Sequence, residues 1–211
     1  IINISGIIIL LDPMLGSHAS PIPLPSLKRY NDDLPIDLSS IPNIDFVILS
    51  HDHYDHLDYK TIKEIRDKVK MFYVPLGLGG HLKRWGVDES SITELNWNQS
   101  VLNDNIKLVC LPARHFSGRG LSDRNSTLWS SWAIISDIGK IYFSGDTGYG
   151  KHFKRIGDEL RRKNAGIARI DETMFKNNVD ISGNLDISGT IFINGNEMAD
   201  TVTLTTSVTN N

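Results

Sequence analysis

The sequence lacks three features that would each define a class of protein: paired cysteines, a strong charge imbalance and a long apolar run. Its one cysteine, Cys110, cannot form an internal disulfide, and its alternating surroundings indicate a buried, inert thiol. The formal net charge of -3 and the pI near 6.2 exclude a global attraction to nucleic acid or anionic lipid. Any affinity for anions must therefore be local.

The apolar N-terminus, residues 1–11, has neither the basic leader of a signal peptide nor the length of a membrane span. Asp12 and Pro13 end this run, so we interpret it as a buried strand. Without a signal peptide or a membrane span in the sequence, a cytoplasmic location is favoured. The chain begins at Ile1 directly with strand-like sequence, which indicates a fragment or a processed product.

A length of 211 residues, 40% of them hydrophobic, suits one large or two small domains. Residues 17–43 are rich in proline and small polar residues, which predicts a long loop. Strands and helices interleave after this loop, and the strands outnumber the helices, so the predicted fold class is α+β. Predicted strands cover 44–50, 71–75, 92–95, 106–113, 132–137 and 140–144, and predicted helices begin at Asp58 and cover 79–86 and 151–163.

The composition changes after residue 163, so we predict one domain over 1–163 and a separate tail over 164–211. Residues 179–196 divide into the hexads VDISGN, LDISGT and IFINGN, with apolar residues first and third and glycine fifth. This period is typical of a β-solenoid or a fibre-like stack of strands. Three hexads are few, and a pair of β-hairpins or a disordered tail rich in threonine and asparagine stays an equal alternative.

The stretch HDHYDH, residues 51–56, gathers three histidines and two aspartates between a predicted strand and a predicted helix. Imidazole nitrogen and carboxylate oxygen are the ligands that zinc and similar metals prefer. Alternation along an extended chain places His51 and His53 on one side, while Asp55 and His56 follow where the chain turns into the helix. This pattern predicts two neighbouring metal positions. The isolated histidines His18 and His81 fit an ordinary hydrogen-bonded role better.

Two further side chains follow predicted strands and so face the same rim. His115 comes just after a strand in PARHFSGRG, and Asp146 lies in the glycine-flanked loop of IYFSGDTGYG. Alone, each would be an ordinary loop residue. Together with the HDHYDH stretch, both become predicted metal ligands.

The segments SHDHYDHLD, PARHFSGRGLSDRNSTLWSSWAI and IYFSGDTGYGKHFKRIG resemble the metallo-β-lactamase superfamily, and within it the branch of N-acylphosphatidylethanolamine-hydrolysing phospholipase D. The segments DPMLGSHASP and ITELNW also resemble that branch, so the likeness covers roughly residues 4–160. It implies an αββα sandwich of which this chain holds the N-terminal half, followed by an unrelated tail that is rich in β-prone repeats.

The resemblance implies two zinc ions. It assigns His51, His53 and His115 to the first ion, Asp55 and His56 to the second, and Asp146 to a bridge between them. It further implies that Asp55 and Asp146 act in catalysis. The family pattern has one more histidine on the second ion, and His152 follows Asp146 too closely to match it. We therefore expect a weakened second metal position and reduced or absent turnover for this chain alone.

The activity implied is hydrolysis of a phosphodiester, in a lipid or a small molecule, by a hydroxide that bridges the metals. A lactonase or a nuclease of the same superfamily is an alternative, although the acidic balance disfavours nucleic acid. A non-catalytic, truncated or chimeric protein associated with virions is another. Contact with a membrane surface and self-association through an exposed sheet or the tail are the other expected partnerships.

Overall fold

The computed structural model describes residues 1–22, 24–31, 34 and 40–163, with side chains described up to residue 160. The chain divides into two compact units, Ile1–Gly148 and Tyr149–Asn211. The hexads lie outside the described residues. The predicted domain boundary after residue 163 falls where the description ends, and it stays a prediction.

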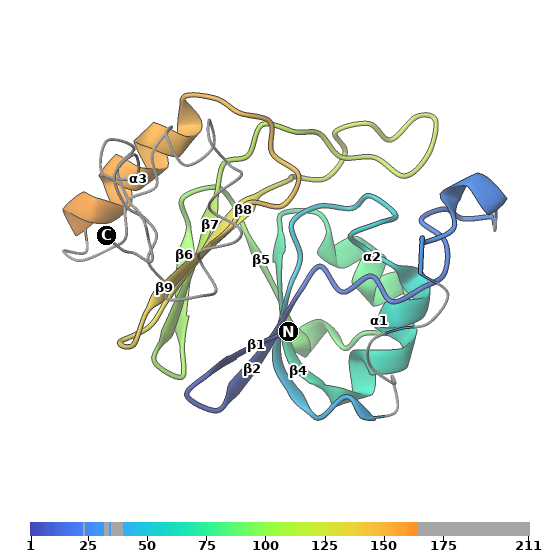
Figure 1. Cartoon of the computed structure of the whole chain (residues 1–211), viewed down its shortest axis with the longest axis horizontal. Helices are drawn as coiled ribbons and strands as arrows, with labels where there is room; N and C mark the ends of the chain where they lie inside the picture. The colour runs from blue at the N-terminus through green and yellow to red at the C-terminus, as the bar shows by residue number, and fades with distance from the viewer. Residues whose placement is uncertain (23, 32–33, 35–39, 164–211) are drawn as a thin grey trace. The chain divides into compact units, whose positions relative to one another are not determined.

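A five-stranded sheet forms the first half of the larger unit (Figure 1). Its strands are β1 (Ile2–Ile4), β2 (Ile7–Leu11), β3 (Ile44–Ile48), β4 (Val69–Pro75) and β5 (Ile92–Leu95), in that order across the sheet. The pair β1 and β2 is antiparallel, and β2 to β5 are parallel neighbours. The carboxyl ends of β2, β3 and β4 therefore meet at one edge.

A four-stranded antiparallel sheet forms the second half of this unit. Its strands are β6 (Ser100–Asn103), β7 (Ile106–Leu111), β8 (Ser131–Ile135) and β9 (Lys140–Phe143). Because β8 separates them, β7 and β9 run in the same direction and end at the same edge. This arrangement brings the loops that follow β7 and β9 together.

Helices and short turns connect the strands. Among the described residues of the first unit they are η1 (Pro25–Leu27), α1 (Tyr59–Ile65), η3 (Arg66–Lys68), α2 (Gly79–Arg84) and η4 (Glu89–Ser91). Helix α3 (His152–Lys163) follows the last strand and belongs to the second unit. Asp58 caps α1, as predicted, because its carboxylate accepts a hydrogen bond from the Thr61 amide at 2.9 Å. Among the described residues, no helix is both long and apolar enough to cross a membrane.

Two clusters of buried side chains hold the first unit together. One cluster joins α1 and α2 to one face of the five-stranded sheet, with Val47, Ile62 and Leu82 among its members. The other fills the space between the two sheets, where Phe46 of β3 and Trp132 of β8 are fully buried. The unit is thus a helical layer on two stacked sheets, which confirms the predicted α+β sandwich.

Three local predictions differ from the structure. The N-terminal run forms a hairpin, because Ser5 and Gly6 have φ of 51° and 92° and turn the chain between β1 and β2. Strand β6 was not predicted, since its sequence SVLN has little apolar pattern. The strand predicted over 71–75 begins earlier, at Val69, because α1 already ends at Ile65. The prediction for Cys110 is confirmed, because burial in β7 raises the pKa of its thiol to about 12.

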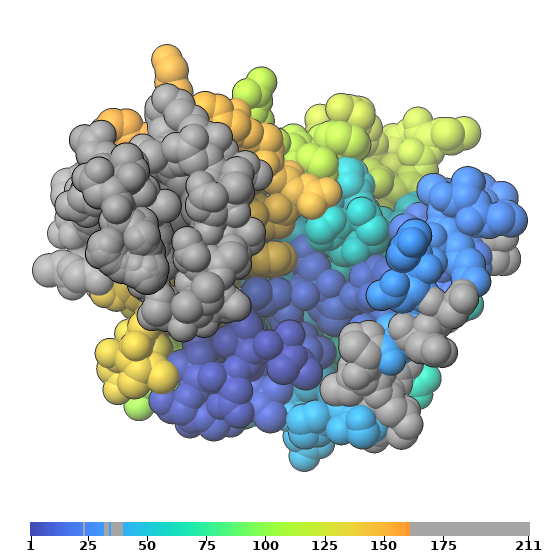
Figure 2. Space-filling model, viewed as in Figure 1, coloured from blue at the N-terminus to red at the C-terminus, as the bar shows by residue number. Residues whose placement is uncertain are grey.

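The segment before residue 32 forms an ordered turn at the surface of the first unit (Figure 2). Backbone hydrogen bonds from Ala19 to Leu27 and from Arg29 to Ser17 close the turn at 3.0 and 2.9 Å. Its exposed apolar side chains are Ile22, Leu24, Leu27 and Tyr30. Apolar side chains held outward by a closed turn are available for contact with another surface.

Candidate metal centre

Strand ends position every predicted metal ligand. The HDHYDH stretch lies in the loop between β3 and α1, His115 follows β7, and Asp146 follows β9. The carboxyl ends of these three strands place the loops next to one another, as the sequence analysis predicts. All six predicted ligands fall into two adjoining groups of side chains.

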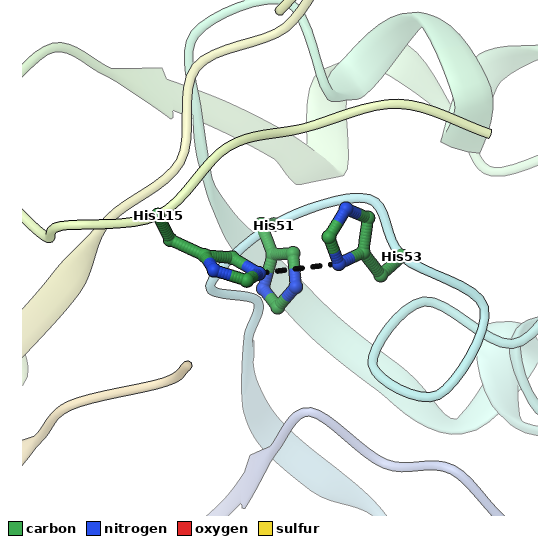
Figure 3. A group of neighbouring side chains, drawn as sticks. All are labelled: His51, His53 and His115. Atoms are coloured by element: carbon green, nitrogen blue, oxygen red, sulfur yellow. Dashed lines mark hydrogen bonds between the residues drawn. The ribbon is translucent and has the colours of Figure 1, made fainter. Parts of the chain in front are cut away.

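The first, here called the three-histidine group, consists of His51, His53 and His115 (Figure 3). One candidate ligand atom from each ring lies within 4.8 Å of those of the other two. The Nε2 atom of His115 is 3.2 Å from Nδ1 of His53, and the rings of His51 and His115 have centroids 4.6 Å apart. Three imidazoles that converge from two loops can hold one metal ion.

The proton positions on His51 follow from its hydrogen bonds. The Ser50 hydroxyl donates its hydrogen to Asp12, so it can only accept from Nδ1 of His51, which lies 2.8 Å away. Burial lowers the pKa of His51, so the ring is neutral and its other nitrogen, Nε2, carries no proton. It is buried and has no hydrogen-bond partner among the residues that the structure describes, although it lies within the cluster of histidine rings. A buried ring nitrogen with a free lone pair is suited to bind a metal ion.

The second, here called the carboxylate group, consists of Asp55, His56 and Asp146. The Nε2 atom of His56 is 3.2 Å from Oδ1 of Asp146 and 3.6 Å from Oδ2 of Asp55. Gly145 lets the Asp146 loop approach, because a Cβ at this position would lie 2.6 Å from Cβ of Ser50. The two groups adjoin, since the rings of His51 and His56 have centroids 4.2 Å apart.

Asp12 belongs to this centre and was missed by the sequence analysis. Its carboxylate accepts from the Ser50 amide at 2.7 Å and lies 2.6 Å from Nδ1 of His56. It also accepts from the Ser50 hydroxyl, so it supports His51 and His56 together. Asp12 has a φ of 38°, a strained conformation that aspartate tolerates better than most residues. A polar residue directly after an apolar strand was the signal, and we interpreted it only as a strand end.

The two groups hold protons differently. Burial lowers the pKa of His51 to about 2 and also lowers those of His53 and His115. Burial alone would lower the pKa of His56 too, but the hydrogen bond and the charge of Asp12 outweigh it and raise that pKa to about 9. Burial raises the pKa of Asp12 as well, so this pair keeps a shared proton at neutral pH.

The donor set fits divalent transition metals. It offers imidazole nitrogen in the three-histidine group and a mixture of nitrogen and carboxylate oxygen in the carboxylate group. Asp12 orients His56 so that Nδ1 faces the carboxylate and Nε2 faces Asp55 and Asp146. A carboxylate behind a ligating histidine is a common arrangement at protein metal sites.

The other histidines lie elsewhere. Nδ1 of His18 is 2.9 Å from the Ser17 hydroxyl, and Nδ1 of His81 is 2.8 Å from the guanidinium of Arg84. Both make local hydrogen bonds, as predicted for isolated histidines, and Nε2 of His81 also lies 3.7 Å from the Asp52 carboxylate. His152 is the first residue of α3, in the second unit.

A cavity of about 400 Å³ opens beside the loop of residues 49–58 between β3 and α1, here called the metal loop. Tyr54, Trp85 and Arg119 contribute to its wall, and none of the six predicted ligands does. The cavity is therefore distinct from the metal centre, although Tyr54 connects the two along the chain.

Comparison with known proteins gives consistent results for sequence and fold. A family model described as "Beta-lactamase superfamily domain" matches residues 8–193. An uncharacterised protein of Mycobacterium tuberculosis is 46% identical over 158 residues, which cover 74% of this chain and 42% of that protein. The N-acyl-phosphatidylethanolamine-hydrolyzing phospholipase D 1 of Caenorhabditis elegans is 41% identical over 171 residues, covering 76% of this chain and 48% of the relative.

The chain thus spans less than half the length of these two relatives. Among solved structures, an isothiocyanate hydrolase from Delia radicum gut bacteria superposes with a TM-score of 0.55 and 21% sequence identity. The match covers 76% of this chain and 63% of that structure. At this identity the likeness concerns the fold alone.

Proposed function

The chain belongs to the metallo-β-lactamase superfamily, and from this premise we propose that its metal centre binds zinc and serves hydrolysis of a phosphodiester, with a lipid as the substrate class. The observation that carries the proposal is that the three-histidine group and the carboxylate group adjoin. The ring centroids of His51, in the first group, and His56, in the second, are 4.2 Å apart. Adjoining groups of this kind suit two metal ions that act on one reacting centre.

Zinc suits the donor set best. Four histidines and two aspartates supply nitrogen and oxygen without any thiolate, which fits a catalytic site better than a closed structural one. When bound, a pair of such ions lowers the pKa of a water molecule towards about 7 and offsets the negative charge of a phosphodiester.

The residues of the chain have separate tasks in this proposal. Four histidine rings and two carboxylates hold the metals, and Asp12 keeps His56 in its ligating tautomer. Asp55 and Asp146 are 57% and 47% exposed, so they face the solvent from which a substrate arrives. In the reaction, water adds its oxygen to phosphorus, the bond from phosphorus to the head-group oxygen breaks, and the departing alcohol takes up a proton. Asp55 is suited to hold that proton.

The assignment of a lipid substrate is supported by the name of the nematode relative, which is 41% identical. The exposed turn with Ile22, Leu24, Leu27 and Tyr30 supports it as well, because apolar side chains at a surface favour contact with a lipid interface. We include peripheral contact with a membrane in the proposal. A Leu24→Ser, Leu27→Ser variant should sediment less with lipid vesicles than the unchanged chain, and equal sedimentation would remove this part.

The test compares substrates on one zinc-loaded preparation. We expect release of head-group alcohol from an N-acylphosphatidylethanolamine vesicle, measured by mass spectrometry, at a higher kcat/KM than cleavage of a lactone or a carboxylic ester. The ratio of the kcat/KM values is the criterion, because we expect low turnover from this chain. A chelator and the His51→Ala variant should both abolish the release. Faster cleavage of the lactone or of DNA would favour the lactonase or the nuclease, and metal binding without any turnover would favour the non-catalytic alternative.

A further inference from the structure

Asp52 lies between two predicted metal ligands, yet its side chain makes its contacts elsewhere. Its carboxylate has no exposed surface. It accepts a hydrogen bond from the Gly118 amide at 2.7 Å and another from the Thr127 hydroxyl at 3.1 Å. Nε2 of His81 lies 3.7 Å from the same carboxylate. Asp52 therefore joins the metal loop to both ends of the segment 118–127.

Arg119 makes the reverse connection. Its Nη1 atom donates to the carbonyl oxygen of Asp52 at 2.6 Å and to that of Leu57 at 2.8 Å, so it spans the metal loop from one side to the other. Its guanidinium carbon also lies 3.9 Å from the centre of the Tyr54 ring, and the Tyr54 hydroxyl donates to the Arg119 carbonyl at 2.9 Å. Asp52 and Arg119 thus form a two-way clasp between the loops.

The clasp leaves the chain little freedom near His115. Gly118, three residues later, has a φ of 146°, and a Cβ there would lie 3.2 Å from Cα of Arg124. On the other side of His115, strand β7 ends at Leu111 within the four-stranded sheet. The chain is therefore held both before and after His115. After His115, the hydrogen bond from the Gly118 amide to Asp52 attaches it to the metal loop.

We propose that Asp52 is a positioning residue, which keeps His115 beside His51 and His53 by anchoring the segment that follows His115. The inference rests on the proposed metal-dependent function, because it concerns the affinity of the three-histidine group for its metal. A single buried carboxylate then sets the geometry of a ligand that is 63 positions away in the sequence. Asp52 itself belongs to none of the candidate ligand groups among the described residues.

The experiment uses the full chain with Asp52→Ala and Thr127→Val. Thr127→Val keeps the shape of the side chain and removes only the hydroxyl that donates a hydrogen bond to Asp52. Hydrogen exchange of the metal-free protein reports on the Gly118 amide, and titration with zinc reports on the affinity of each group. We expect faster exchange at Gly118 in Asp52→Ala. We also expect a loss of about ten- to a hundredfold in zinc affinity at the three-histidine group, the usual effect of removing a supporting partner.

Asp45→Ala is the matched control. Asp45 also accepts one backbone hydrogen bond, from the Ile8 amide at 2.9 Å, but it lies in β3 outside the clasp. This variant should leave the Gly118 exchange rate and the zinc affinity unchanged at similar thermal stability. Thr127→Val should change the Gly118 exchange rate and the zinc affinity in the same direction as Asp52→Ala, but by less. This variant keeps the test informative if Asp52→Ala does not fold.

Unchanged Gly118 exchange and unchanged zinc affinity in both clasp variants would overturn the inference. Equal losses in Asp45→Ala would also overturn it, because they would indicate a general effect of stability. Neither readout depends on turnover. A chain that binds zinc and cleaves no phosphodiester would refute the proposed function and leave this inference standing, whereas a chain that binds no zinc would refute both.

Discussion

The three-histidine group and the carboxylate group adjoin, but they are prepared for a metal in opposite ways. Burial keeps the rings of the first group neutral, with the pKa of His51 lowered to about 2. In the second group, Asp12 raises the pKa of His56 to about 9, so a proton occupies the pair at neutral pH. A metal can enter the first group directly, whereas it must displace a proton from the second. The difference predicts that the three-histidine group fills first.

The largest expected effect comes from removing one ring of the first group. His115→Ala leaves two imidazoles and should lower zinc affinity there by more than about a hundredfold, while the carboxylate group keeps its ligands. The matched variant Asp146→Asn should weaken the carboxylate group and spare the other. Zinc titrations of both variants with a competing chelator measure this. If Asp146→Asn weakens both groups, Asp146 bridges the two ions as the sequence resemblance implies.

Asp12→Asn should have the next largest effect, at the carboxylate group. The variant removes the charge that orients His56, so zinc affinity above pH 9 should fall by about ten- to a hundredfold. Below that pH the loss should shrink, because the proton on His56 is also held less tightly. Asp45→Asn serves as the control for loss of a carboxylate in the same sheet. An unchanged affinity at high pH would show that Asp12 does not support the ligand.

The pH dependence of zinc binding tests the protons directly. Below pH 9 the affinity of the carboxylate group should fall about tenfold for each pH unit, because one proton must leave His56. The affinity of the three-histidine group should stay nearly constant from neutral pH up to 8.5, since its rings are already neutral. Calorimetry in buffers of different ionisation enthalpy counts the released protons. Equal proton release from both groups would contradict the comparison.

The smallest expected effect is on the stability of the metal-free chain. The folded-state pKa of His56 is raised above its ordinary value of 6.5, so its contribution is complete below pH 6.5 and is lost as the pH rises through 9. The pKa of His51 is lowered, so its contribution is complete above pH 6.5 and is lost as the pH falls. Tm should therefore peak near pH 6.5. Each kcal/mol lost from the free energy of unfolding should lower Tm by about 2–4 °C.

His56→Gln should remove the decline in Tm on the alkaline side and leave the decline on the acidic side. Scans in the presence of a chelator measure both. A Tm that rises steadily from pH 6.5 to 9 would show that the pair of Asp12 and His56 does not keep its proton.

The candidate ligands that share a local pattern were predictable from the sequence. His51, His53, Asp55 and His56 lie in one loop, and their grouping follows from short-range geometry. Most strand positions were also predictable, because buried strands are apolar over four to seven residues. The convergence of His115 with this loop follows from the ends of strands, and the structure confirms that they meet.

Asp12 and Asp52 were not predictable in the same way. Asp12 reaches His56 because β2 lies parallel to β3 with Leu11 opposite Ile48, a long-range register that no local pattern reveals. Asp52 lies between the candidate ligands His51 and His53, so alternation along the chain predicts that its side chain points away from them. The sequence does not show which residues that side chain contacts. The residues that support a site are harder to predict than its ligands, since their partners are distant in the chain.

The central claim is that the HDHYDH loop binds zinc, and the zinc content of the purified chain tests it most directly. After dialysis at neutral pH, elemental analysis should find at least about one zinc ion per chain, held by the three-histidine group. The His51→Ala, His53→Ala variant should lose that ion, and Asp45→Ala should keep it. Equal zinc in the unchanged chain and in the double variant would contradict the account.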